Sequence, residues 1–203
     1  MRVAIVDYGM GNLKSITGAL QYIGVQTIIV SSDHETLLSA DKLILPGVGS
    51  FPKAMQTIKE QRLHECLRSF AFDYQKPILG ICLGMQLMGI NSTEHGDHIG
   101  LGFIHGNVTK FNTGQIRVPH VGFNQVLVNP ALRLYHGLQG LIDFYFTHSF
   151  KMSSDEPINP CYCDYGGAFI ASYEMENIAG VQFHPELSQS NGLQLLKNFI
   201  EYF

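Results

Sequence analysis

The first ninety residues alternate between short apolar runs and segments in which apolar residues recur with helical spacing. Four runs have the length and β-branched content of buried strands, at 3–8, 25–30, 42–47 and 77–81. Between them, apolar residues recur every three or four positions, which predicts helices over 13–23, 54–72 and 83–88. Strands that alternate with helices form βαβ units, so we expect a mostly parallel sheet with helices on its faces.

After about residue 100 the pattern changes. Strand-like segments follow one another closely, at 107–111, 120–128, 143–150, 159–165, 168–174 and 178–184. This spacing predicts hairpins and a mixed extension of the sheet. Gly192 to Phe203 has helical spacing and should form a docking helix. No linker or repeat interrupts the chain, so residues 1–203 are expected to form a single three-layer α/β domain with an open, mostly parallel or mixed, flavodoxin-like sheet.

Composition excludes several classes of function. Hydrophobic residues make up 45% of the 203 residues and charged residues 15%, which is typical of a globular rather than a disordered chain. The net charge is −4 and the 13 lysines and arginines are scattered, so no nucleic-acid partner is expected. No apolar segment approaches the length of a membrane span, and the chain enters a strand pattern at once, without a signal peptide. We therefore expect a cytoplasmic protein with no membrane partner.

The cysteines and glycines do not predict a metal or cofactor site. The four cysteines are Cys66, Cys82, Cys161 and Cys163. A domain of this size folds without disulfides, so reduced thiols are expected, and the C-x-C spacing differs from the C-x-x-C of zinc and redox sites. Gly9 and Gly11 lack the third glycine of a dinucleotide-binding motif, because that position is Lys14. They read as turn glycines that also let a partner or ligand approach the backbone.

Cys82 lies where an apolar strand ends and a helix begins, in the sequence Gly80-Ile-Cys-Leu-Gly84. One interpretation is a small buried hydrophobic residue. The other is a nucleophile elbow, in which flanking glycines permit a tight strand-to-helix turn. The free N–H groups and partial positive charge at a helix start favour the thiolate, and the N–H of Leu83 would face a developing oxyanion.

A cysteine nucleophile requires a base, and His184 is the best of nine histidines. It ends a strand-like segment, and Pro185 forces it into an extended conformation. Residues i and i+2 of an extended chain face the same way, so Glu186 can orient the imidazole. His-Pro-Glu is also an ordinary loop sequence, and only its pairing with Cys82 makes it notable. His120 and His148, in strand-like runs, remain alternatives. His34, His64, His95 and His98 lie in polar segments and are weaker candidates.

A second oxyanion donor is predicted in Pro46-Gly-Val-Gly-Ser50, which follows a strand. Its glycines allow backbone N–H groups to turn toward a pocket. An ordinary glycine-rich turn is an equally good interpretation of these residues alone.

Taken together, PGVGSF, GICLGMQLM and VQFHPE resemble the class I (triad) glutamine amidotransferases. The segments VAIVDYGMGNL, GLGFI, VPHVGFN, YFTHSF and DYGGAFIAS extend the similarity, over almost the whole chain, to the family of glutaminase subunits of imidazole glycerol phosphate synthase. The combination of YGMGN and PGVG separates this family from the glutaminases of other pathways.

The resemblance implies hydrolysis of L-glutamine to glutamate and ammonia through a glutamyl thioester, without a cofactor. Cys82, His184 and Glu186 would form the catalytic triad. Val48, Gly49 and Leu83 would form the oxyanion hole, and Gln86, Glu94, Ser149 and Phe150 would bind the substrate. The ammonia would pass through a channel to a (β/α)₈ cyclase subunit, the partner in a heterodimer of histidine biosynthesis. Phe123, Gly9 and Asn12 would lie at that interface.

Two residues depart from the pattern of this family. Phe123 stands where tryptophan is usual, in a chain with no tryptophan, and Phe150 stands where tyrosine is usual. Neither residue belongs to the triad, but both departures leave the identity of the partner undecided. One alternative is a paralogous glutaminase that supplies ammonia for amidination of bacterial surface sugars through a cyclase-like partner. The other is an interaction subunit that has lost catalysis, although all three triad positions are filled.

Overall fold

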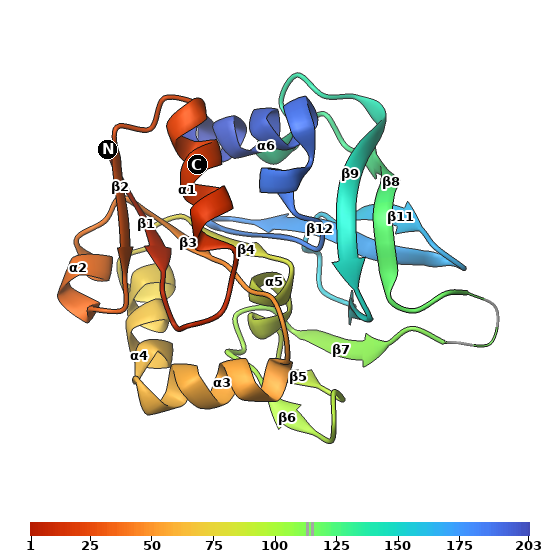
Figure 1. Ribbon diagram of the computed structural model, residues 1–203, viewed down its shortest axis with the longest axis horizontal. Coiled ribbons are helices and arrows are strands. Elements are labelled where there is room, and N and C mark those ends of the chain that lie inside the picture. Colours follow the sequence, from red (N-terminus) through yellow and green to blue (C-terminus); the bar gives the residue numbers. More distant parts are fainter. Residues whose placement is uncertain (113, 115) are drawn as a thin grey trace.

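A nine-stranded mixed sheet runs through the centre of the computed structural model, which describes residues 1–112, 114 and 116–203 (Figure 1). Its strand order is β2-β1-β3-β4-β13-β12-β11-β8-β9. These strands are β1 (Arg2–Val6), β2 (Thr27–Ser31), β3 (Lys42–Leu45), β4 (Ile78–Ile81), β8 (His120–Val128), β9 (Gly140–His148), β11 (Cys161–Asp164), β12 (Ala168–Met175) and β13 (Ile178–Val181).

The sheet has a parallel half and an antiparallel half. Strands β2, β1, β3, β4 and β13 pair in parallel, and β12, β11, β8 and β9 continue the sheet in antiparallel pairs. Every residue of β3, β4 and β13 is buried, whereas β8 and β9 alternate buried and exposed positions along much of their length. Central strands covered on both faces need continuous apolar sequence, whereas a half-covered pair needs alternation.

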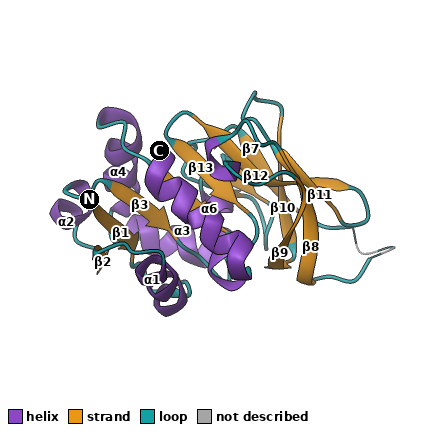
Figure 2. Ribbon diagram, turned by 90° about the horizontal axis from the view of Figure 1, so that it is seen from above, coloured by secondary structure: helices purple, strands orange, loops and turns teal. Residues whose placement is uncertain are grey.

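Helices cover both faces of the parallel half, which gives three layers (Figure 2). The helices are α1 (Leu13–Tyr22), α2 (His34–Leu38), α3 (Phe51–Glu60), α4 (Leu63–Arg68), α5 (Leu83–Leu87) and α6 (Gln189–Tyr202). Val3 and Ile5 of β1 pack with α1 and α6, while Ala4 and Val6 pack with α3, α4 and α5. This alternation along one strand divides the core between the two faces of the sheet. Among the described residues, none of the helices is long and apolar enough to cross a membrane.

The predicted extension of the sheet is only partly correct. Four strands form a second sheet of their own in the order β10-β7-β5-β6: β5 (Asn91–Ser92), β6 (His98–Ile99), β7 (Gly106–Lys110) and β10 (Phe150–Ser154). The single predicted strand 143–150 is therefore divided at Ser149, where the chain leaves its pairing with β8 and pairs with β7 instead. An apolar pattern identifies strands but not their neighbours, so it does not reveal such a change of sheet.

The predicted helix over 54–72 is also divided. It consists of α3, α4 and a π-helical turn at Ser69–Asp73, and the break comes at Arg62, whose φ of 55° is left-handed. The apolar spacing continues across the break because Leu63 and Leu67 are buried like the α3 residues before them. The short helix α2 was not predicted; Asp33 caps it by accepting a hydrogen bond from the Thr36 N–H at 2.8 Å.

Candidate active site

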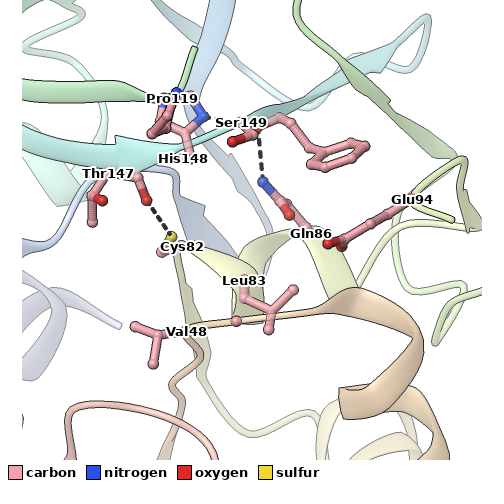
Figure 3. Close-up of a pocket in the computed structure, with 11 residues that line it drawn as sticks. Val48, Cys82, Leu83, Gln86, Glu94, Pro119, Thr147, His148 and Ser149 are labelled. Carbon is pink, nitrogen blue, oxygen red and sulfur yellow. Dashed lines mark hydrogen bonds between the residues drawn. The ribbon is translucent and has the colours of Figure 1, made fainter.

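The loops that follow the parallel strands meet around a pocket of about 290 Å³ at one edge of the sheet (Figure 3). Such edges, beyond the carboxyl ends of the strands, are where open α/β sheets bind ligands. The turn after β3, the β4–α5 junction and the segment that joins β9 to β10 supply most of the wall. The lining residues are Val48, Gly49, Cys82, Leu83, Gln86, Glu94, Pro119, Thr147, His148, Ser149 and Phe150.

Cys82 stands at the strand-to-helix turn that the sequence predicts. It caps α5 with φ 53° and ψ −108°, a strained conformation for a residue with a side chain. A Cβ atom at Gly84 would lie 1.9 Å from the Leu45 carbonyl oxygen, and one at Gly80 would lie 2.7 Å from the Met85 nitrogen. The two glycines are therefore required by close backbone contact, and they hold the Cys82 side chain at the pocket wall.

His184 and Glu186 form a buried pair beside Cys82. The Nδ1 atom of His184 lies 2.9 Å from Oε1 of Glu186, and the two side chains are 3% and 1% exposed. The sequence predicts this contact from extended geometry, but only His184 is extended, with φ −102° and ψ 96°. Glu186 belongs to a 3₁₀ turn at Pro185–Leu187, so the pairing is confirmed and its expected geometric basis is wrong.

The surroundings of His184 favour its charged form. Burial by itself lowers the pKa of His184, but the neighbouring Cys82 and Glu186 outweigh burial and raise this pKa to about 10. Nε2 of His184 is buried and has no hydrogen-bond partner of normal geometry among the described residues. An imidazolium held by Glu186, with Nε2 uncommitted near a thiol, can both stabilise a thiolate and deliver a proton.

The turn after β3 places Val48 on the opposite side of Cys82 from Thr147 (Figure 3), and Gly49 of the same turn also lines the pocket. Gly49 has φ 107°, which a residue with a side chain rarely adopts. The hydroxyl of buried Tyr8 donates to the Pro46 carbonyl at 2.7 Å and fixes the start of the turn. Burial and the nearby Cys82 raise the pKa of Tyr8 well above its usual value, so this hydroxyl remains a donor.

The four residues that the resemblance assigns to substrate binding all line the pocket. Nε2 of Gln86 donates to the Phe150 carbonyl at 3.0 Å and to Oε1 of Gln182 at 2.8 Å. Glu94 accepts from the Phe51 N–H at 2.8 Å through Oε2. Oε1 of Gln86 accepts no hydrogen bond from the described residues, so it can accept one from a ligand.

His120 and His148, the alternative bases, form a neutral pair with each other. Nδ1 of His120 lies 3.1 Å from Nε2 of His148, and Nδ1 of His148 lies 2.8 Å from the Phe150 carbonyl. Because a carbonyl only accepts, His148 donates through Nδ1 and accepts from His120 through Nε2. Burial lowers the pKa of His120 to about 4 and that of His148 to about 3. His120 in turn accepts through Nε2 from the Asn124 amide at 3.3 Å, so the acceptor nitrogen of each ring is occupied and neither ring suits the role of general base to Cys82.

The remaining sites predicted from the sequence lie away from the pocket wall. Gly9 and Asn12 are on the turn after β1, and Phe123 is on the outer face of β8, 49% exposed. Burial raises the pKa of Cys66 to about 11 and that of Cys163 to about 12, so both are unreactive thiols. Cys161 is buried in the same way, and its pKa is also raised. Among the described residues, no group of three His, Cys, Asp or Glu side chains is arranged to hold a metal ion.

Sequence reasoning missed three residues at the site. Pro119 and Thr147 line the pocket, and Gln182 donates to the Cys82 sulfur at 3.6 Å. A polar residue between Val181 and Phe183, in an otherwise apolar strand, was the available signal for Gln182. Pro119 and Thr147 carry no such signal, because prolines and threonines are ordinary at strand ends.

Comparison with known proteins agrees with this geometry. The model of the glutamine amidotransferase class-I family matches residues 4–202. The HisH 2 subunit of imidazole glycerol phosphate synthase from Vibrio vulnificus is 45% identical over 203 residues, which is 100% of this chain and 95% of that protein. The HisH subunit from Aquifex aeolicus is 42% identical over 98% of this chain and 96% of its own length.

Solved structures of low sequence identity share the fold. A glutamine amidotransferase crystal structure superposes with a TM-score of 0.78 at 18% identity, over 99% of this chain and 98% of that one. A chain of the Thermotoga maritima PurLQS structure superposes with a TM-score of 0.77 at 18% identity, with the same coverage of both chains. Together with the family match and the close relatives, this establishes that the chain belongs to the class-I glutamine amidotransferase family, among the relatives of the imidazole glycerol phosphate synthase HisH subunits.

Proposed function

We propose that this chain is the glutaminase subunit of an imidazole glycerol phosphate synthase and hydrolyses L-glutamine to glutamate and ammonia. The observation that carries the proposal is the buried His184–Glu186 pair beside Cys82 at the wall of a polar pocket. A nucleophile, a base and a group that orients the base are the elements required for acyl transfer from an amide.

In the first half of the reaction, the Cys82 thiolate attacks the carboxamide carbon of glutamine. The carbon–sulfur bond forms as the carbonyl electrons move to oxygen. When the tetrahedral intermediate collapses, the carbon–nitrogen bond breaks and the protonated His184 gives its Nε2 proton to the leaving nitrogen. The products of this half are ammonia and a glutamyl thioester on Cys82. Glu186 holds the imidazole in place and stabilises its positive charge.

In the second half, His184 takes a proton from water, which attacks the thioester carbon. The carbon–sulfur bond then breaks, glutamate leaves, and the thiolate–imidazolium pair is restored. Both tetrahedral intermediates place negative charge on the same oxygen. The N–H groups of Leu83, at the start of α5, and of the Val48–Gly49 turn are the proposed donors to that oxygen.

Two acceptors suit the amino-acid end of glutamine. Oε1 of Gln86 and the carboxylate of Glu94 face the same pocket as Cys82, and both attract an α-ammonium group. Ser149 and Phe150 line the adjacent wall. The pocket is small, which fits a single amino acid rather than a peptide.

The proposed partner is a (β/α)₈ cyclase subunit that forms a heterodimer with this chain and receives ammonia through a channel. The cyclase would use it in ring closure, giving imidazole glycerol phosphate and an aminoimidazole carboxamide nucleotide in histidine biosynthesis. Support comes from the relatives, which are named as subunits of imidazole glycerol phosphate synthase. The proposed compartment is the cytoplasm, which is supported by the four free cysteines.

The test is replacement of Cys82 by alanine in the complex with the cyclase from the same cell. Glutamine-dependent synthesis should fall by orders of magnitude, while synthesis from added ammonia continues, because only the nucleophile is lost. Cys66→Ala is the matched control and should retain activity. A glutamine-analogue electrophile should label Cys82, as located by mass spectrometry. Labelling of Cys66, Cys161 or Cys163 instead would contradict the assignment.

The same complex tests how the glutaminase is controlled. Because Gly49 can reorient its peptide at low cost, we propose that the isolated chain binds glutamine but hydrolyses it slowly, and that the cyclase with its bound nucleotide favours the competent turn. Full-rate glutamine hydrolysis by the isolated chain would exclude this form of control.

A further inference from the structure

Gln182 is a buried polar residue that the reaction described above does not use. It directly follows β13, two positions before His184, and is completely buried. Its neighbours Val181 and Phe183 pack into the core on the α1 and α6 side of the sheet. A buried amide in such a position is costly unless its hydrogen bonds are satisfied, so its partners indicate what it does.

The hydrogen bonds of Gln182 fix which way its amide points. The Phe150 carbonyl can only accept, so the Gln86 atom 3.0 Å from it is the nitrogen Nε2. The same nitrogen donates its second hydrogen to Gln182 at 2.8 Å, so the Gln182 atom that accepts it must be the oxygen Oε1. This leaves the Nε2 group of Gln182 directed at the Cys82 sulfur, 3.6 Å away.

Apart from His184, which approaches it from the side of the base, the Cys82 sulfur has one other polar neighbour of note among the described residues. It lies 3.9 Å from the Thr147 carbonyl oxygen, to which a neutral thiol can donate. A thiolate has no proton to give, so that carbonyl would repel it, and it would need N–H donors instead. Gln182 supplies such a donor from the protein interior, and it needs no movement to do so.

We propose that Gln182 is a positioning residue that holds the Cys82 sulfur and stabilises it as a thiolate, with Gln86 and the Phe150 carbonyl keeping the Gln182 amide in the donating orientation. This inference rests on the proposed function, because it assumes that Cys82 is the nucleophile. It assigns Gln182 a role in the reactivity of the sulfur, and it leaves substrate binding to Gln86.

The test measures the rate of Cys82 alkylation by iodoacetamide against pH in the full chain, with the modified peptide quantified by mass spectrometry. Iodoacetamide is small and uncharged, so its reaction does not depend on the groups that bind the amino-acid end of glutamine. Gln182→Met keeps the approximate volume of the side chain and removes the donor. At pH 7 the rate should fall roughly tenfold, and the whole profile should shift to higher pH.

Two further variants complete the comparison. Gln182→Glu keeps the shape and the acceptor for Gln86, but at neutral pH it presents no N–H to the sulfur, so it should slow alkylation at least as much. Gln56→Met is the matched control, because Gln56 donates to Glu60 on the surface of α3 and should leave the profile unchanged. Alkylation of Cys66, Cys161 and Cys163 would show that Gln182→Met has opened the fold. In that case the alkylation profile of the isosteric variant Gln182→Glu is the one that tests the proposal.

The kinetics of the complex with the cyclase give a second readout. Gln182→Met should lower kcat for glutamine and leave KM within about twofold, whereas Gln86→Met should raise KM. Alkylation profiles of Gln182→Met and Gln182→Glu that coincide with that of the unchanged chain would overturn the inference. The failure of the proposed function looks different, since glutaminase activity would then survive Cys82→Ala.

Discussion

Nδ1 of His184 lies 2.9 Å from Oε1 of Glu186, and a 3₁₀ turn rather than an extended strand brings the two atoms together. Pro185 occupies the first position of that turn, where its fixed φ suits helical geometry and its missing N–H is not needed. The turn also lets the Ser188 hydroxyl donate to the His184 carbonyl at 2.6 Å. The local sequence therefore sets the orientation of the imidazole before any substrate binds.

Replacement of Glu186 by glutamine should test this orientation. The amide keeps an oxygen that can accept from Nδ1 but lacks the charge that stabilises the imidazolium. We expect kcat for glutamine to fall by about 10²–10⁴-fold with little change in KM, as neutralising the acidic member of a triad does. The measurement is steady-state glutaminase activity of the complex with the cyclase. Glu176→Gln, at an exposed turn, is the control, and a loss of less than threefold for Glu186→Gln would contradict the assignment.

The substitution Gly84→Ala should destabilise the protein, whereas Gly18→Ala should not. A Cβ atom at position 84 would lie 1.9 Å from the Leu45 carbonyl oxygen, so backbone must move, and we expect a loss of about 2–4 kcal/mol in the free energy of unfolding. Gly18 lies in α1 with open space around it, so alanine there should raise the free energy of unfolding by about 0.5–1 kcal/mol. Urea unfolding of both variants measures the difference, and equal effects would contradict the close contact.

The His120–His148 pair should make stability depend on pH. Their pKa values in the folded chain, about 4 and about 3, lie below the usual 6.5. Below pH 6.5 the unfolded chain therefore binds more protons at these two residues than the folded chain does. Each histidine should then cost about 1.4 kcal/mol of stability per pH unit, between pH 6.5 and its folded pKa. The pKa of His184 is raised instead, so its contribution stays constant in this window and is lost only as the pH rises from 6.5 toward 10.

Urea unfolding between pH 7 and pH 4.5 measures this dependence. In the variant His120→Leu the slope should be shallower by about 1.4 kcal/mol per pH unit, because one of the two histidines is gone. His105 is exposed, so His105→Leu is the matched control and should keep the original slope. If His120→Leu and the unchanged chain have the same slope, the pair is not buried in its neutral form.

Phe123→Ala should weaken binding of the cyclase and leave the fold intact. Phe123 is 49% exposed on the outer face of β8, opposite Tyr145 of β9, with the two ring centroids 5.5 Å apart. We expect the melting temperature of the isolated chain to stay nearly unchanged and the affinity for the cyclase to fall by roughly 1–3 kcal/mol. Calorimetric titration and a thermal melt measure the two quantities.

The same truncation at Tyr22, which is 79% exposed at the end of α1, is the control for Phe123→Ala. It should change neither quantity. A large drop in melting temperature with unchanged affinity would show instead that Phe123 serves the packing of β8 on β9.

Local sequence determined much of this protein. The glycines around Cys82 imply a turn that only glycine tolerates, and the structure has that turn between β4 and α5. The apolar runs identified the buried strands because a strand covered on both faces needs no polar positions. Cys82, His184 and Glu186 were therefore identified as candidates before any contact between them was known.

Tertiary structure decided which of these groups meet and in what state. The separate sheet of β5, β6, β7 and β10 depends on pairing between distant segments, and an apolar pattern carries no information about pairing partners. The same holds for Gln182 and for the His120–His148 pair, whose neighbours are far away in the sequence. Protonation and hydrogen-bond direction depend on burial and on the atoms nearby, and only the folded chain fixes both.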